Sequence, residues 1–148
     1  MTSTNNPPTN NTDSLDANIP LRIIANDNIS QRKRILSFLD NSKNTHYLSI
    51  IALSEIIYVL DSQYNYTRTQ IVDGLNFFLT RYDTKIKYNH SLTSLAFPMF
   101  LANPKLSFND CLLTAEAQIS HHQPLITLDR KLANQSPSAT LLPRSPIA

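Results

Sequence analysis

The chain has 148 residues, 41% of them hydrophobic, which is enough for one domain around one core. Its single cysteine, Cys111, excludes an internal disulfide and a cysteine-based zinc site, and its single glycine, Gly74, excludes glycine-rich phosphate loops. The formal net charge of +2 is typical of an ordinary solvated surface, and no apolar run approaches the roughly 18–20 residues that a membrane span needs.

Both ends of the chain are polar. Residues 1–13 lack the basic start and apolar middle of a secretory signal, so we expect a disordered leader. Residues 137–148 contain three prolines and are expected to form a tail that can add a short edge strand at LLP, 141–143. We therefore predict a single domain over 14–136, in a cytoplasmic protein.

The first part of this domain begins with two predicted helices. NIPLRIIA, 18–25, is typical of a short helix that Asn18 can cap, and Ser30 is expected to cap the next. THYLSI, 45–50, is β-like and leads into an apolar helix, LSEIIYVL. A strand followed at once by a helix is the repeating unit of an α/β fold.

The alternation continues along the chain. The predicted elements, in order, are a helix capped by Thr67, a strand at 84–88, a helix at 92–102 with a kink or break at Pro98, an amphipathic helix at 108–122 capped by Ser107, a strand at 124–128 and a short helix at 129–134. Such alternation predicts a mostly parallel sheet covered on both faces. Binding sites in these sheets form beyond the carboxyl ends of the strands.

Four acidic residues stand out against this pattern. Glu55 interrupts the apolar run YLSIIALSEIIYVL, and Asp129 directly follows the apolar strand PLITL. Asp16 precedes the first helix, and Asp110 lies in the first turn of another. Acidic side chains are almost never buried unless they are paired or bind a metal.

Each of the four also has an ordinary structural explanation. Asp110 is favoured by the helix dipole, and Asp129 can cap the helix that follows it. Glu55 can pair with Arg22 or Arg130, and Asp16 can belong to the polar leader. Taken together, however, four carboxylates at one sheet edge would repel one another unless a cation is present. Oxygen ligands of this kind select Mg²⁺ or Mn²⁺.

The local strings around these acids resemble those of a known family. The chain is similar to PIN-domain ribonucleases, particularly VapC-type toxins of bacterial toxin–antitoxin pairs. The four motifs appear in the family's order, as LDANIPLRIIANDN, ALSEIIYVL, LSFNDCLLTAEA and LITLDRKLA. They depart from the family pattern at Ala17, where Thr or Ser is common, and in the polar stretch before Asp16, which predicts a short first strand.

The resemblance implies a three-layer α/β/α PIN-like fold with a central, mostly parallel sheet of four to five strands. It implies that Asp16, Glu55, Asp110 and Asp129 hold one or two Mg²⁺ or Mn²⁺ ions, and that metal-activated water hydrolyses RNA to a 5′-phosphate and a 3′-hydroxyl. Asn18 and Thr127 would orient these groups.

By the same resemblance, RNA contacts are expected from Arg22, Arg130 and Lys131, although solvated surface charge explains these three equally well. The expected partners are an RNA substrate, a protein antitoxin and a second copy of the chain in a homodimer. Two alternatives are a PIN-like interaction module with a weakened metal site, and an RNA-processing PIN nuclease without an antitoxin.

Overall fold

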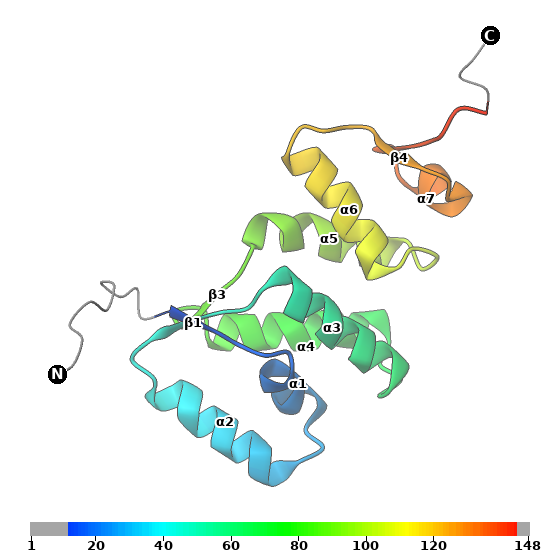
Figure 1. Cartoon of the computed structure of the whole chain (residues 1–148). Helices are drawn as coiled ribbons and strands as arrows, with labels where there is room; N and C mark the ends of the chain where they lie inside the picture. Colours follow the sequence, from blue (N-terminus) through cyan, green and yellow to red (C-terminus); the bar gives the residue numbers. More distant parts are fainter. Residues whose placement is uncertain (1–11, 145–148) are drawn as a thin grey trace, which may run out of the picture. The chain divides into compact units, whose positions relative to one another are not determined.

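The computed structural model describes residues 12–144. The chain divides into two compact units, one ending at Tyr88 and the other beginning at Asn89, and each is described by itself. Every described strand pairs in parallel with its neighbour, and helices connect consecutive strands (Figure 1). The predicted α/β class with parallel strands is therefore confirmed.

The first unit contains a three-stranded sheet with the order β1-β2-β3. Its strands are β1 (Thr12–Ser14), β2 (Thr45–Tyr47) and β3 (Ile86–Lys87). Between the strands lie α1 (Asn18–Ala25), α2 (Ile29–Asn41), α3 (Ile50–Ser62) and α4 (Arg68–Arg81). β1 is short and polar, as the sequence predicts, and it begins at Thr12, inside the segment expected to be a leader; residues 1–11 lie outside the described residues.

Two predicted helix caps in this unit are wrong. α2 begins one residue before Ser30, because the side chain of Asn28 accepts a hydrogen bond from the Gln31 amide. Asn18 is the first helical residue of α1 rather than its cap. The cap at Thr67 is confirmed, since Thr67 and Gln70 form a reciprocal capping box.

The core of the first unit lies among α1, α3 and α4. The apolar side chains that recur at helical spacing along α4 are buried: Ile71, Val72, Leu75, Phe78 and Leu79. Gly74 lies where α4 approaches α1 closely, and a Cβ at this position would be 2.8 Å from Ile24 Cγ2. The only glycine of the chain is thus required by the spacing of two helices.

The second unit contains a two-stranded parallel sheet and three helices. Its elements are α5 (His90–Ala102), α6 (Phe108–Ile119), β4 (Leu125–Thr127), α7 (Arg130–Gln135) and β5 (Ala139–Leu141). β5 is the edge strand that the sequence allowed at LLP, placed two residues earlier. The predicted sheet of four to five strands thus appears as five described strands, three in one unit and two in the other.

The helix α5 continues through Pro98, so the predicted break does not occur there. Proline cannot donate to the carbonyl of Ser94, but both residues are exposed, so water can satisfy that carbonyl. On its other side α5 packs against α6 through the rings of Phe97, Phe100 and Phe108, with centroid distances of 5.9 and 5.5 Å to Phe108. Among the described residues, no helix is both long enough and apolar enough to cross a membrane.

Candidate metal centre

Asp16 lies at the carboxyl end of β1. The preceding residue, Leu15, still pairs with β2, since its amide donates to the Tyr47 carbonyl at 2.9 Å. Asp16 is exposed, and its Oδ1 accepts a hydrogen bond from the Asn18 amide at 3.3 Å. The structure therefore places Asp16 at a strand-to-helix junction, and it places Asn18 in contact with the Asp16 carboxylate.

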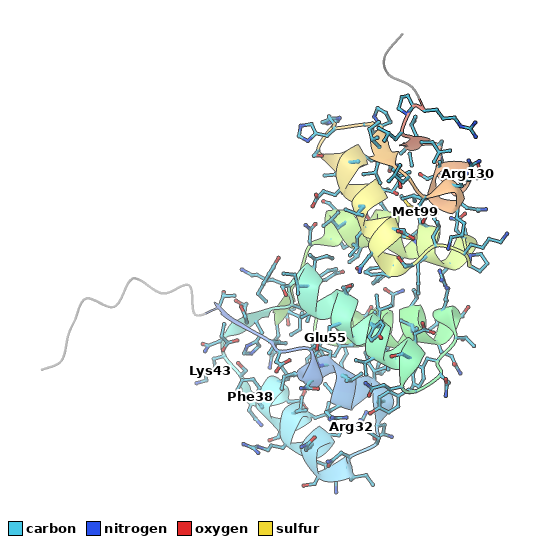
Figure 2. All side chains as sticks on the ribbon, turned by 45° about the vertical axis from the view of Figure 1, so that its right-hand side comes forward. Arg32, Phe38, Lys43, Glu55, Met99 and Arg130 are labelled. Carbon is cyan, nitrogen blue, oxygen red and sulfur yellow. The ribbon has the colours of Figure 1, made fainter. Side chains whose placement is uncertain are left out.

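Glu55 lies on α3, the helix that follows β2 (Figure 2). The buried face of α3 consists of Ala52, Leu53, Ile56, Ile57 and Leu60. Glu55 is on the opposite face and is exposed, as is Ile51, whose relative exposure is 78%. The apolar run around Glu55 therefore does not bury its carboxylate, and burial does not account for this acid.

The topology brings Asp16 and α3 to the same edge of the first sheet. Because β1 and β2 are adjacent and parallel, both strands end at this edge, and α3 begins three residues after β2. Arg22 forms its ion pair with Asp27, at 3.2 Å, rather than with Glu55.

Asp110 occupies the first turn of α6. Its Oδ2 accepts from the Ser107 amide and its own amide donates to Ser107 Oγ, each at 3.1 Å. This reciprocal pair is a capping box, and it confirms the predicted cap at Ser107. Asp110 is therefore favoured at the N-terminus of its helix, as its structural explanation predicts. The capping hydrogen bond occupies only one of its two carboxylate oxygens.

Asp129 has a similar local role. It is the N-cap of α7, and its Oδ1 accepts from the amides of Lys131 at 2.8 Å and Leu132 at 3.4 Å. Thr127, at the end of β4, accepts from the Asp129 amide through Oγ1 at 3.0 Å. Thr127 thus contacts the backbone that carries the Asp129 carboxylate, and its role in orienting that carboxylate stays a prediction.

Each unit supplies two of the four predicted acids. Within the described parts, 12–88 and 89–144, the structure contains no group of three or more His, Cys, Asp or Glu side chains arranged to hold a metal ion. The chemistry of the four carboxylates nevertheless suits Mg²⁺ or Mn²⁺, which prefer hard oxygen ligands. Metal binding by all four acids therefore stays a prediction.

Arg22 belongs to a hydrogen-bonded cluster with Asp27 and Tyr64. Its Nη1 donates to the Tyr64 oxygen at 3.2 Å, and the Tyr64 hydroxyl donates to Asp27 Oδ2. The bond from Tyr64 is the main cause that lowers the pKa of Asp27 below its ordinary value of 3.8, and the charge of Arg22 lowers it further. The bond to Tyr64 likewise raises the pKa of Arg22.

A pocket of about 420 Å³ lies between α1 and α2, next to Asn18. Its lining includes two cationic side chains, Arg22 and Arg34, and the exposed ring of Phe38. The other two basic residues predicted to contact RNA, Arg130 and Lys131, are exposed at the start of α7 (Figure 2). All three predicted basic residues are thus solvent-accessible to some degree, which is compatible with a role in binding.

A polar group that the sequence did not single out is the buried imidazole of His46. This side chain has a relative exposure of 0% and contacts Asp13 through Nδ1 and Ser42 through Nε2. A histidine in the middle of a predicted strand was a possible signal. Its partner could be known only from the register that places Asp13 opposite His46.

Comparison with known proteins adds a family match. A family model described as PIN domain matches residues 14–136, a span that includes all four acids. Among solved structures, the chain is similar to VapBC2 from Rickettsia felis bound to a DNA fragment from their promoter, with 22% identity, coverage of 88% of this chain and 97% of that chain, and a TM-score of 0.36. No curated protein matches the chain significantly.

Proposed function

Because the chain belongs to the PIN domain family, we propose that it is a divalent-metal-dependent endoribonuclease and the toxin of a toxin–antitoxin pair. PIN domains are generally nucleases. The observation that carries the proposal is the family match over 14–136, which contains Asp16, Glu55, Asp110 and Asp129. The local geometry supports it, since three of these acids lie at strand-to-helix junctions or in first helical turns.

In this proposal the four carboxylates hold Mg²⁺ or Mn²⁺. The bound metal would supply an activated water and neutralise charge on the scissile phosphate. The protein's own contribution is orientation: Asp110 and Asp129 are held by helix caps, and Thr127 fixes the backbone beside Asp129. Each cap engages one carboxylate oxygen, which leaves the other oxygen for the metal.

We further propose that RNA is held by basic groups near these acids. Arg22 lines the pocket beside Asn18, two residues from Asp16, and Arg130 and Lys131 directly follow Asp129. Cations next to these acids would contact phosphates of the RNA and would position the strand without reading its sequence. The antitoxin, the homodimer and a cytoplasmic location belong to the same proposal, on the strength of the VapC-like motifs.

The two glutamates of the chain allow a matched test. Glu55 is a proposed metal ligand, whereas Glu116 is an exposed residue on α6 without a proposed role. We expect the wild-type protein and Glu116→Gln to cleave a labelled single-stranded RNA with Mg²⁺ or Mn²⁺, and cleavage to stop with EDTA. Glu55→Gln should lower the rate at least about 100-fold, because even residues that only support metal ligands are worth roughly 10–100-fold.

Two outcomes of this test would contradict the nuclease. One is cleavage that persists in EDTA, and the other is equal cleavage by Glu55→Gln and wild type. A second candidate, a PIN-like module that binds a partner without cleaving RNA, is favoured by the exposed apolar side chains Ile51 and Tyr58 beside Glu55, at 78% and 69%. That candidate predicts neither cleavage nor stabilisation by Mn²⁺ in the wild-type protein.

An RNA-processing nuclease without an antitoxin would share this chemistry. It differs from the toxin in its biology rather than in its site, so cleavage assays cannot separate the two. A small antitoxin-like reading frame beside the gene, together with growth arrest that the neighbouring product relieves, would support the toxin. Growth that is unaffected by expression of an active nuclease would support the processing enzyme.

A further inference from the structure

The strand that leads to Asp16 has no buried apolar side chain among its own three residues. β1 has only three residues, Thr12, Asp13 and Ser14, all polar and all exposed. Among the described strands, it lies at the edge of its sheet and pairs with β2 alone. These three residues gain little from the hydrophobic effect, so the register of β1 depends on hydrogen bonds and on Leu15, the buried residue that follows.

Two side-chain contacts supplement the backbone pairing of β1 with β2. Asp13 lies opposite His46 in the parallel register, and its Oδ1 accepts a hydrogen bond from Nδ1 of that imidazole. One position earlier, the hydroxyls of Thr12 and Thr45 are 2.6 Å apart. We call the first of these contacts the Asp13–His46 latch.

The imidazole of the latch is itself firmly held. Ser42 Oγ lies 2.8 Å from Nε2 on its other side, and the ring of Phe38 packs against it with a centroid distance of 5.3 Å. A carboxylate can only accept, so the proton shared with Asp13 is carried by Nδ1. His46 is therefore a fixed, buried donor aimed at an exposed carboxylate on the edge strand.

This contact lies three residues before Asp16. The chain from Asp13 to Asp16 stays on β2, because the Leu15 amide donates to Tyr47 O at 2.9 Å. A shift of β1 by one residue would turn its side chains to the other face of the sheet and move Asp16 along the edge. The latch opposes that shift.

We propose that His46 is a positioning residue, which sets the Asp16 carboxylate for metal binding by fixing Asp13, and with it β1, on β2. This inference rests on the proposed metal-dependent nuclease. It assigns His46 no contact with substrate or metal, and it explains how a polar first strand can deliver a functional acid.

The test uses three single substitutions in β1 of the full chain. Asp13→Ala removes the acceptor, Asp13→Asn keeps an acceptor oxygen without the charge, and Ser14→Ala is a control on the same strand. Amide hydrogen exchange at Leu15 reports on β1–β2 pairing, and exchange at Leu48, whose amide donates to Lys87 O at 2.8 Å, reports on β2–β3 pairing.

Asp13→Ala should speed exchange at Leu15 by roughly 10- to 100-fold, as expected for loss of a hydrogen bond to a charged group. Exchange at Leu48 should stay close to that of wild type, because β2–β3 pairing does not involve Asp13. Asp13→Asn should restore most of the protection at Leu15, and Ser14→Ala should match wild type. Unchanged exchange at Leu15 in Asp13→Ala would overturn the latch.

Titration with Mn²⁺ alone then tests whether the latch positions Asp16. Wild type and Ser14→Ala should bind Mn²⁺ with equal affinity. Asp13→Ala should bind it about 10-fold more weakly, which is the lower end of the range for loss of a group that supports a metal ligand, and Asp13→Asn should have an intermediate affinity. Equal affinity in wild type and Asp13→Ala, with faster exchange at Leu15, would overturn the positioning role. Absence of Mn²⁺ binding in wild type would instead refute the proposed metal site and the positioning role with it, whereas the exchange result would still establish or refute the latch.

Discussion

The double role of Asp110 gives the most informative prediction, because cap and metal ligand can be separated. The Asp110 carboxylate accepts from the Ser107 amide, and Ser107 Oγ accepts from the Asp110 amide. Asp110→Ala loses the first bond and a favourable charge at the helix N-terminus. Asp110→Asn keeps an acceptor oxygen and loses the charge, and Ser107→Ala loses the second bond and leaves the carboxylate.

The expected costs without metal follow from these contacts. Asp110→Ala should lose about 1–2 kcal/mol, the sum of a hydrogen bond and a dipole interaction. Asp110→Asn should lose about 0.3–1 kcal/mol from the dipole alone, and Ser107→Ala about 0.5–2 kcal/mol from the N-cap. For a domain of this size each kcal/mol lowers Tm by roughly 2–4 °C.

Added Mn²⁺ should reverse the order of the variants. At a concentration of about 100 times Kd, a metal ion stabilises the folded state by roughly 2.7 kcal/mol, or about 5–11 °C in Tm. Ser107→Ala should keep this gain although it is less stable without metal. Asp110→Asn should lose most of the gain although it is more stable.

Thermal unfolding by circular dichroism, with and without Mn²⁺, measures both effects in one experiment. If Asp110→Asn kept the full increase in Tm while the wild type also showed it, Asp110 would be a helix cap and nothing more. An equal loss of the increase in Ser107→Ala would show that the metal effect follows the integrity of α6 rather than the carboxylate.

Three further predictions concern the first unit. Because Tyr64 lowers the pKa of Asp27, the cluster stabilises the fold above pH about 3.8 and loses this contribution as pH falls through the lower folded-state pKa of Asp27. Tyr64→Phe should therefore reduce the difference in unfolding free energy between pH 6 and pH 3. An unchanged difference would argue against a stabilising role of the cluster. Gly74→Ala should lose up to about 2 kcal/mol in urea unfolding, because the 2.8 Å approach to Ile24 costs about 1–3 kcal/mol against a helix-propensity gain of about 1 kcal/mol. A more stable variant would show that Ile24 can move aside. Lys85→Met should lose about 1 kcal/mol in urea unfolding, because Lys85 Nζ donates to the carbonyls of Leu39 and Asp40, in the last turn of α2, at 2.6 and 2.8 Å. Equal stability of the variant and the wild type would mean that water replaces both bonds.

Local sequence patterns predicted much of the fold. Apolar periodicity predicted the helices and the strands that begin near residues 45, 84 and 124. Contacts within one helical turn account for the caps at Thr67 and Ser107. The wrong cap at Ser30 shows the limit of such patterns, because Asn28 offers the same chemistry two residues earlier and tertiary packing decides which one begins the helix.

For the candidate site, the sequence identified acids at strand-to-helix junctions but not their surroundings. That Asp110 and Asp129 would be oriented by helix caps was readable, since both caps are local. That Glu55 would be exposed was not, because an apolar run such as YLSIIALSEIIYVL does not say which face of its helix is covered.

By itself, then, the sequence determined where helices and strands form and which carboxylates end at their junctions, because propensity, capping and periodicity act over a few residues. Only the tertiary structure decided that Arg22 and Asp27 both bond to Tyr64, 42 and 37 residues away, and that Asp13 meets a buried His46 across two parallel strands. These contacts depend on register and on the crossing of helices, which are set by the packing of the whole unit and leave no mark within any short segment.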